Sequence, residues 1–354
     1  MLQFRRISSL FLVLSTVVLL SSCGKEGTPG TSTSTTPVYD TATQGSPVTE
    51  SANKFIYLRP PVGEVYRYRM QIVSNGSAQH IDSLFKQYPP NEKLSVTTTI
   101  YMRHTIRQIR QDSSVDIAFR FDTIKTVTDA NGNKTDLSTA RESDLKDPMF
   151  TNASAISGKD LGAIVTRNGD VVELYGTTAI LAKYMSQLPD SLKTQQTQMR
   201  LNQQIQTTIS EYLQKTLTHF PAKALAKDTA WGGTITQNTP VWQNVLYPTA
   251  VESREFVRGF EERDGKVLAI FDATTNVKPT QAVMDQGNAK TTLNNFELVT
   301  KATSHVEVET GVLVYRKIIQ DRATNFQIES KVGANQRYQG ISKANETTTV
   351  ELLK

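Results

Sequence analysis

Histidine side chains are the groups in this sequence best suited to hold a metal ion or to move a proton near neutral pH. The chain of 354 residues has four of them, at positions 80, 104, 219 and 305. None lies in a His-x-His or His-x3-His spacing or beside a cysteine, so the sequence predicts no zinc site. His104 falls on the apolar side of an expected strand and is predicted to be a hydrogen-bonded core or rim residue. His219 lies near the expected end of a helix, where the helix dipole favours it.

Oxygen-bearing side chains alternate from Asp129 to Asp136, which partly matches the spacing of a calcium-binding loop. Such a loop needs glycine at its sixth position and a bidentate glutamate at its twelfth. Here Gly132 is the fourth residue and Ala140 is the twelfth. A tight turn at Asn131-Gly132 explains these residues better, so we expect no metal site in this segment.

Pairs of carboxylates are the groups that glycoside hydrolysis requires. Neighbouring acids occur at Asp144 and Asp147 and at Glu261 and Glu262, in polar turns where solvated surface positions are expected. The two acids of a glycosidase need not be close in sequence. An envelope hydrolase that uses acidic residues therefore stays open as an alternative function.

Motifs for other kinds of chemistry are missing from the sequence. No serine lies in Gly-x-Ser-x-Gly, and Gly158 and Gly162 lack the spacing and the following Lys-Ser or Lys-Thr of a phosphate-binding loop. We therefore expect no catalytic residue, no cofactor and no metal ligand. Trp231, Trp242 and Tyr247 could form a stacking platform for a sugar or a peptide, but packing at the start of a strand is the interpretation we favour.

The amino-terminal segment is organised as an export signal. Residues 1–22 contain Arg5 and Arg6, then the apolar stretch Ile7–Leu20, then small residues before Cys23. The apolar stretch is shorter than the ~20 residues that a membrane-spanning helix needs. The string Leu-Ser-Ser-Cys resembles the lipobox of bacterial lipoproteins, in which the cysteine accepts diacylglycerol and becomes the first residue of the mature chain. The resemblance implies that Cys23 is the lipidation site and that the lipid anchors the protein to a membrane.

Composition limits the class of protein further. Cys23 is the single cysteine of the chain, so no disulfide can form and the exported body must be held together by its core. The net charge of +5 falls to +3 once the two arginines of the signal are removed (5 − 2 = 3), and the positive charge is not clustered. We therefore expect no nucleic-acid partner. A hydrophobic fraction of 38% is ordinary for a globular body.

Residues 23–53 are rich in Ser, Thr, Pro and Gly and have almost no apolar side chain to anchor them in a core. A flexible chain of this composition spans roughly 30 Å, enough to hold a folded body away from the membrane. Gly24, directly after the cysteine, resembles the choice that sends lipoproteins to the outer membrane. We expect a lipid anchor in the outer membrane, on its periplasmic or surface face.

The segment 54–175 shows the period of two that is typical of half-buried strands. Apolar residues alternate with polar ones at 66–72, 96–106 and 115–121, and Asn168-Gly169 between β-branched runs indicates a two-residue hairpin turn. Antiparallel strands with one wet face are the expected result.

Helical spacing replaces this pattern in residues 176–220. A short helix is expected from Thr177 to Leu188, followed by a second one capped by Asp190 or Ser191 that runs to about His219. The second helix has an apolar face on one side and glutamines on the other.

A β pattern returns in residues 221–354, which we assign to a second β unit and a carboxy-terminal tail. Trp231 corresponds to Tyr66, the hairpin that ends in Phe271-Asp272 to the one that ends in Phe121-Asp122, and the turn at Thr310-Gly311 to Asn168-Gly169. The sequence thus predicts a mostly β (α+β) fold of two related antiparallel units, 54–175 and 221–330, joined by helices. Tyr68, Phe119, Phe271 and Leu213 are expected to be buried.

The repeated pattern resembles an uncharacterised family of secreted, Bacteroidetes-type lipoproteins with a duplicated β unit. Its halves begin with Gly-acidic-x-aromatic, which Gly63-Glu64-Val65-Tyr66 matches, and close with a glycine-centred hairpin. Lys227–Trp231 stands at the corresponding place in the second half without the glycine. The resemblance covers most of residues 54–330 and implies no activity.

Together these features favour a non-catalytic binding or scaffolding protein of the cell envelope, with an envelope protein, a glycan or a lipid as partner. A carrier of an apolar ligand such as a lipid is an alternative, because a curved sheet covered by an amphipathic helix can enclose an apolar cavity. An apolar cavity would favour the carrier, and converging acids would favour the hydrolase.

Overall fold

The computed structural model describes residues 46–47, 54–81, 91–147, 150–242, 245–286, 289–330 and 337–353. The export segment, Cys23 and nearly all of the tether lie outside these residues, so the predictions made for them stay predictions.

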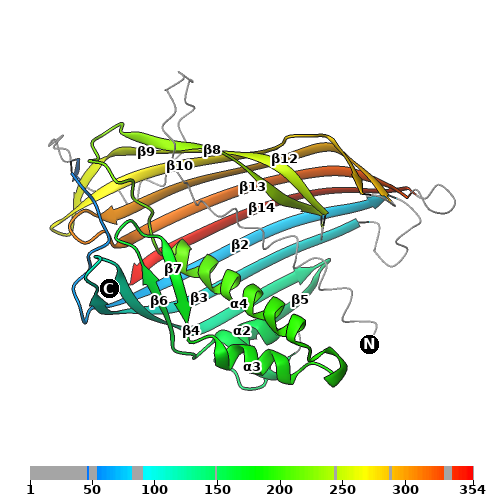
Figure 1. Ribbon diagram of the computed structural model, residues 1–354, viewed down its shortest axis with the longest axis horizontal. Coiled ribbons are helices and arrows are strands. Elements are labelled where there is room, and N and C mark those ends of the chain that lie inside the picture. The colour runs from blue at the N-terminus through cyan, green and yellow to red at the C-terminus, as the bar shows by residue number, and fades with distance from the viewer. Residues whose placement is uncertain are drawn as a thin grey trace.

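Long strands make up most of the described chain, and they belong to one 14-stranded sheet (Figure 1). The strands of the first half are β1 (Ser46–Pro47), β2 (Val65–Ile81), β3 (Asn91–Ile109), β4 (Val115–Ala130), β5 (Asn133–Ser138), β6 (Leu161–Val165) and β7 (Val171–Tyr175). Those of the second half are β8 (Ala230–Trp242), β9 (Val245–Arg263), β10 (Lys266–Pro279), β11 (Val283–Gln286), β12 (Ala289–Glu307), β13 (Leu313–Ser330) and β14 (Arg337–Leu353).

The main path through the sheet is β1-β9-β10-β12-β13-β14-β2-β3-β4-β6-β7, with β8 on β9, β11 on β12 and β5 on β4. Each of these strand pairs is antiparallel. The predicted mostly β, antiparallel class is therefore confirmed.

The two halves are not separate sheets, because β14 pairs with β2 from Leu353↔Arg67 to Gln339↔Ile81. The carboxy-terminal residues that we expected to be a tail are thus the strand that joins the halves. Long strands without a strong apolar alternation, such as β14, are recognised from their neighbours and not from their own sequence.

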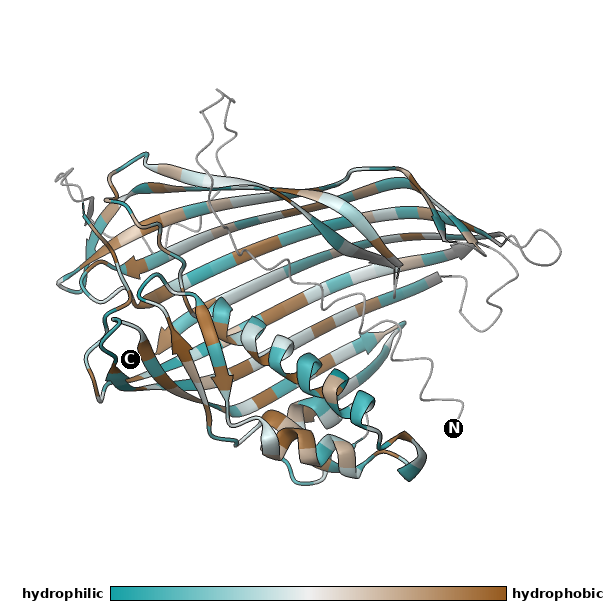
Figure 2. Cartoon of the chain, viewed as in Figure 1, coloured by the Kyte–Doolittle hydropathy of each residue, from teal (hydrophilic) through white to brown (hydrophobic). Residues whose placement is uncertain are grey.

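The inner face of the sheet is the one that turns toward the helices in Figure 1. Side chains alternate between this face and a polar outer face, which Figure 2 shows as alternating hydrophobic and hydrophilic residues along the strands. On the outer face, Arg69 and Glu351 pair across β2 and β14 at 2.6 Å. The predicted wet face is confirmed.

Three α-helices lie among the described residues: α2 (Thr151–Ile156), α3 (Thr178–Ser186) and α4 (Gln195–Lys215). The predicted first helix corresponds to α3. The predicted second helix is wrong at both ends: Asp190 starts only the 3-10 turn η5 (Asp190–Leu192), and α4 begins after Thr194, whose hydroxyl accepts the Thr197 N–H at 3.2 Å. The chain leaves the helix after Lys215, so His219 is not at its end, and its Nδ1 lies 2.8 Å from Asp170 Oδ1.

Two apolar clusters occupy the inner face. The larger one lies under the helices and includes Tyr68, Phe119, Phe271 and Leu213, whose predicted burial is confirmed by exposures of 3%, 2%, 4% and 0%. The smaller one lies toward the other end of β9–β14 and is centred on Tyr247, Phe296, Phe326 and Tyr338.

Two segments, one before β2 and one before β8, cross the tips of the β6–β7 and β12–β13 hairpins. Phe220 N donates to Asn168 O and Leu58 N donates to Arg167 O, each at 2.8 Å, and Arg59 N donates to Thr310 O at 2.8 Å. A Cβ on Gly169 would lie 2.0 Å from Thr218 O, and one on Gly311 would lie 2.3 Å from Tyr57 O. Only glycine permits these crossings, which close the larger core.

Candidate functional site: a polar row on the inner face

The histidines that the sequence singled out lie apart from one another. His104 is 3% exposed, its Nε2 lies 3.5 Å from Thr216 Oγ1, and its burial lowers its pKa to about 3. The prediction of a core histidine is confirmed. His305 Nδ1 contacts Glu261 Oε1 at 3.0 Å, while the side chain of His80 lies outside the described part of the chain. Among the described residues, no three His, Cys, Asp or Glu side chains are grouped to hold a metal ion.

The segment from Asp129 forms the expected turn. Asn131 and Gly132 have φ values of 53° and 88°, and Gly132 N donates to Asp129 Oδ1 at 2.8 Å. These are the positive angles of a two-residue hairpin turn. The interpretation as a turn between β4 and β5 is confirmed.

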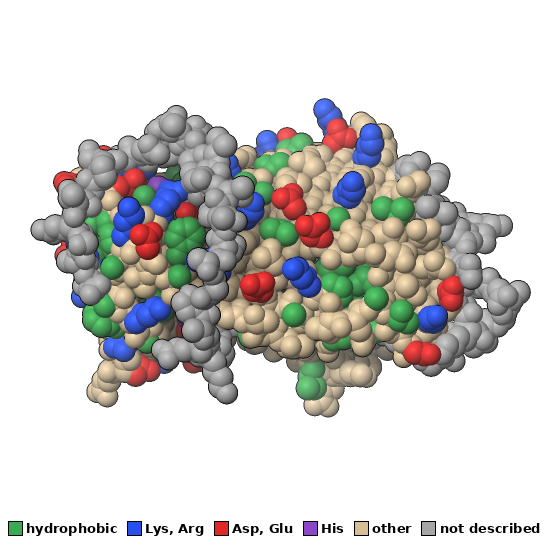
Figure 3. All heavy atoms as spheres, turned by 90° about the horizontal axis from the view of Figure 1, so that it is seen from above, with side chains coloured by type: hydrophobic (Ala, Val, Ile, Leu, Met, Phe, Trp, Pro, Cys, Tyr) green, Lys and Arg blue, Asp and Glu red, His purple; other side chains and the backbone are tan. Residues whose placement is uncertain are grey.

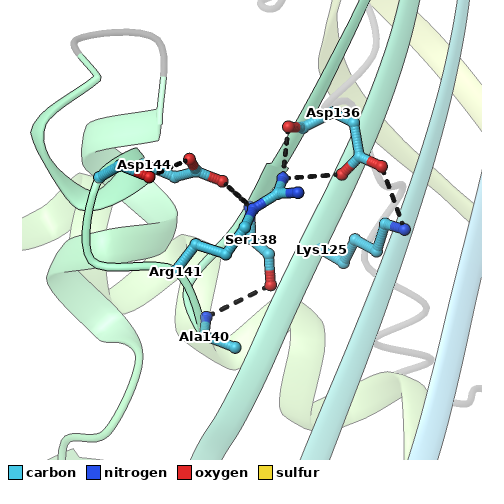
Figure 4. Close-up of polar contacts among 7 residues, drawn as sticks. Lys125, Asp136, Ser138, Ala140, Arg141 and Asp144 are labelled. Carbon is cyan, nitrogen blue, oxygen red and sulfur yellow. Dashed lines mark hydrogen bonds and ion pairs between the residues drawn. The ribbon is translucent and has the colours of Figure 1, made fainter.

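The carboxylates that follow this turn hold together the corner between β5 and the 3-10 turn η3 (Asp144–Lys146) (Figure 4). Lys125 Nζ lies 3.2 Å from Asp136 Oδ2, and hydrogen bonding to Lys125 lowers the pKa of Asp136. Asp144 accepts the Ser138 N–H at 2.8 Å, which lowers its pKa, and Arg141 Nε donates to the same carboxylate at 2.6 Å. These acids are occupied by structural contacts.

The three aromatic residues considered as a platform are not assembled into one. Trp231 packs its ring 5.9 Å from that of Phe271 in the larger cluster, whereas Tyr247 is buried in the smaller one and donates to Thr291 O at 2.8 Å. The side chain of Trp242 lies outside the described residues. Packing is therefore the role of Trp231 and Tyr247.

A small pocket lies at the end of the larger cluster, beside Tyr66, Tyr68, His104, Thr216 and Val312. Its volume is about 20 Å³, which is room for about one water molecule. This pocket is too small for an acyl chain.

Between the two apolar clusters, one row of inner-face residues is polar. The strand registers place Ser74, Glu346, Gln320, Thr300, Thr275 and Ser253 side by side across β2, β14, β13, β12, β10 and β9. We call these six residues the polar row. Gln320, Thr300 and Ser253 are half-buried, and Ser74 and Thr275 are 4% and 2% exposed. Five strand spacings of ~4.8 Å make the row roughly 24 Å long.

Helix α4 adds charged groups at one end of the polar row. Lys215 Nζ lies 3.6 Å from Glu346 Oε1, and Ser74 Oγ donates to Glu346 Oε2 at 2.9 Å. Glu211, one turn before Lys215, has its pKa raised to about 7, chiefly by burial and further by the negative charge of Glu346, against the opposing effect of Lys215. Two carboxylates and an ammonium thus converge where the helix meets the row.

Arg316 fixes this end of the helix. The guanidinium, on β13, donates to the carbonyl oxygens of Gln214, Lys215 and Leu217 at 3.2, 3.2 and 2.7 Å. It also donates to Ser304 Oγ and Thr218 Oγ1, each at 2.8 Å. Burial lowers its pKa to about 10, and the cation satisfies carbonyls that a helix end leaves without partners.

Sequence reasoning missed the residues of this site. Glu346 and Arg316 carry no local motif, and only strand pairing brings them beside α4. Gln214 was among the glutamines predicted on the polar side of a helix, but Lys215 was not singled out, and the sequence did not show which strands that side would meet.

Residues 112–248 match a family model described as "Family of unknown function (DUF6263)". The matched stretch runs from the turn before β4 into β9 and contains α2, α3 and α4. The expected similarity to an uncharacterised family is thus confirmed at this level. No curated protein matches the chain.

Several solved outer-membrane proteins align along most of the chain with little similarity. OccK9 (OpdG) of Pseudomonas aeruginosa is 6% identical, with 82% of this chain and 99% of that chain covered and a TM-score of 0.22. OccK11 (OpdR) of Pseudomonas aeruginosa is 7% identical, with 83% and 99% covered and a TM-score of 0.20. OmpT, an outer membrane protein of Vibrio cholerae, is 8% identical, with 84% and 99% covered and a TM-score of 0.15. Similarities this low carry no argument about the present chain.

The helices of the described residues include none that combines the length and the apolar character needed to cross a membrane.

Proposed function

We propose that the protein is a lipid-anchored binding protein of the cell envelope and that it binds a glycan, without catalysis, along the polar row. The observation that carries the proposal is the row itself: hydroxyl, amide and carboxylate groups follow one another across six neighbouring strands. Hydroxyl and amide groups both donate and accept hydrogen bonds, and a carboxylate accepts them, so the row can pair with the hydroxyls of a sugar, which do both. The members of the row that are half-buried, Glu346, Gln320, Thr300 and Ser253, extend over four strand spacings, roughly 19 Å, which suits a chain-like ligand.

The distribution of polarity on the inner face separates this proposal from the apolar carrier. A carrier requires a continuous apolar lining, whereas here the polar row divides the two apolar clusters. The pocket of about 20 Å³ beside His104 also has no room for an acyl chain. The hydrogen-bonding groups of the row favour a polar ligand over a lipid.

The proposed location, anchored to the outer membrane by a lipid, is supported by the amino-terminal sequence. The lipobox-like string at Cys23 supports lipidation, Gly24 supports sorting to the outer membrane, and the Ser/Thr/Pro-rich tether supports a body that stands away from it. A membrane-tethered body with an inner binding face is suited to hold an envelope glycan close to the membrane.

Internal duplication is the finer part of the resemblance, and we propose it as the origin of the fold. In both halves the strands follow the sequence order, β2-β3-β4-β6-β7 and β8-β9-β10-β12-β13. Equivalent hairpins carry the same ion pair, Arg103–Asp122 at 3.5 Å and Arg258–Asp272 at 3.6 Å. Gly169 and Gly311, at the crossed hairpin tips, are also equivalent.

Binding of neutral hexasaccharides tests the function. Isothermal titration of the full chain with maltohexaose, isomaltohexaose and chitohexaose should show saturable binding of at least one of them. Thr300→Val removes a hydroxyl from the row and should weaken that binding about tenfold, which corresponds to the net contribution of one hydrogen bond to a ligand. The matched control, Thr99→Val, lies on the outer face of β3 and should bind as the unaltered chain does. Uptake of phospholipid from vesicles, together with no hexasaccharide binding, would refute the proposal.

A hydrolase is the second candidate, because Glu211 and Glu346 converge beside the row. The carboxyl group of Glu211 has a raised pKa and lies near a second acid, Glu346, that contacts Lys215, and a pair of acids in different surroundings is what a general acid and its partner require. Incubation of the chain with the bound hexasaccharide, followed by mass spectrometry, separates the two functions. Shortened saccharides that disappear in Glu211→Gln would indicate hydrolysis, whereas an intact ligand indicates binding alone.

A further inference from the structure

The edge strand β8 is long and free of charge. It pairs with β9 on one side, from Ala230↔Phe256 to Trp242↔Val245. On its other side, no strand in the described part of the chain pairs with it. Its sequence, Ala-Trp-Gly-Gly-Thr-Ile-Thr-Gln-Asn-Thr-Pro-Val-Trp, contains no acidic or basic residue. Thr234, Thr236 and Asn238 are exposed along it.

Other strands at the margins of the sheet are protected in the usual ways. β5 has six residues and includes Lys134 and Asp136, and β7 has five and includes Glu173. Short length and charge discourage pairing with another chain, and β8 has neither. The view in Figure 3, from the side that holds β8, β9 and β10 in Figure 1, shows charged side chains scattered and not gathered.

Comparison of the halves indicates what belongs at this edge. In the order of the two meanders, β8 corresponds to β2. The edge of β2 that points away from β3 is paired with β14, an antiparallel strand of 17 residues. The equivalent position beside β8 lacks a strand among the described residues.

We propose that the edge of β8 pairs antiparallel with β8 of a second copy of this chain, so that the protein is a twofold dimer with one sheet running through both copies. A twofold axis makes the pairing of a strand with itself antiparallel. Because β8 carries no charge, this pairing places no like charges opposite each other.

The register follows from the strand's own sequence. Centred on Ile235, the pairing sets Ile235 opposite Ile235 of the partner subunit and Thr234 opposite Thr236 of the partner subunit. Aliphatic and threonine pairs of this kind stabilise antiparallel strands. Gly232, with φ of 135°, ends the paired stretch on one side, so that a pairing centred on Ile235 covers residues 233–237 of each copy. Pro240, which has no N–H, lies beyond this stretch.

Sedimentation velocity of the full chain carrying Cys23→Ser tests the dimer. We expect dimers whose dissociation constant rises at least tenfold in Thr236→Lys, because the pairing would bring two ammonium groups close together at the twofold axis. Thr135→Lys makes the same change on the exposed edge of β5 and should leave the dissociation constant unchanged. Circular dichroism confirms that each variant is folded. A monomer at all concentrations, or a dimer that Thr236→Lys does not weaken, would overturn the proposal.

Cysteine cross-linking tests the register in the same background, which has no other thiol. Ile235→Cys places two thiols opposite each other and should give a covalent dimer on mild oxidation. Gln237→Cys lies on the same face of the strand, but its two copies would be offset by four residues, or ~13 Å, and should not cross-link. Equal cross-linking of the two variants, or none in Ile235→Cys, would contradict the pairing.

Discussion

The contact between Arg316 and the end of α4 determines whether the helix keeps its place over the inner face. Replacing Arg316 by methionine keeps much of the length of the side chain but removes the cation and all five of its hydrogen bonds. Three of these bonds are 2.8 Å or shorter, to Leu217 O, Ser304 Oγ and Thr218 Oγ1. A hydrogen bond to a charged group contributes about 1.5 kcal/mol at the low end of its range. The variant should therefore lose about 4.5 kcal/mol of the free energy of unfolding.

Urea unfolding, followed by the fluorescence of Trp231 and Trp242, measures this loss. Arg67→Met is the matched control, because Arg67 is exposed on the outer face of β2, and it should change the free energy of unfolding by less than about 0.5 kcal/mol. A loss below about 1 kcal/mol in Arg316→Met would show that the guanidinium does not hold the helix end.

Three further predictions concern other parts of the chain. Burial raises the pKa of Glu211 to about 7, so its neutral form stabilises the fold at pH 4 and that stability is lost as the pH rises through 7. In urea unfolding, Glu211→Gln should therefore be about 1–2 kcal/mol more stable than the unaltered chain at pH 8 and equal to it at pH 4. A pH-independent difference between the two proteins would contradict this. In thermal unfolding, Gly169→Ala should destabilise the fold by at least about 2 kcal/mol more than Gly132→Ala does. Both glycines have positive φ, but only a Cβ at Gly169 would clash with backbone, at 2.0 Å from Thr218 O. Equal losses of stability would show that the crossing segment moves to make room for the methyl group. Cys23→Ser should leave a folded protein in the soluble fraction after cell fractionation, and an unfolded or membrane-bound product would refute the assignment of the anchor.

The sequence predicted those parts of the fold that depend on neighbouring residues. Alternation in 66–72 and 115–121 located long strands, and Asn131-Gly132 located a turn whose two positive φ values the structure confirms. At Asn168-Gly169 the hairpin is present but the predicted two-residue turn is wrong: only Gly169 has a positive φ, and Gly169 N donates to Thr166 O at 2.9 Å in a three-residue loop. The start of α4 was misplaced because Asp190 and Thr194 are both good capping residues, and only packing against α3 and β7 selects the second.

Features that depend on distant pairing were not accessible from sequence patterns. The strand β14 has threonines at 347–349 and little apolar alternation, so it was taken for a tail, although it joins the halves through β2. The polar row is likewise invisible in any one strand, because each strand contributes a single residue. Glu346 becomes recognisable as part of a site only through its contacts with Ser74 on β2 and Lys215 on α4.

The most direct test of glycan binding along the polar row compares two glutamines by isothermal titration with the hexasaccharide that binds the unaltered chain most tightly. Gln320 is a half-buried member of the row, and Gln71 is exposed on the outer face. If the row holds the ligand, Gln320→Leu weakens binding at least tenfold and Gln71→Leu leaves it unchanged. Equal affinities in the two variants would contradict the account, because the ligand would then lie elsewhere on the protein.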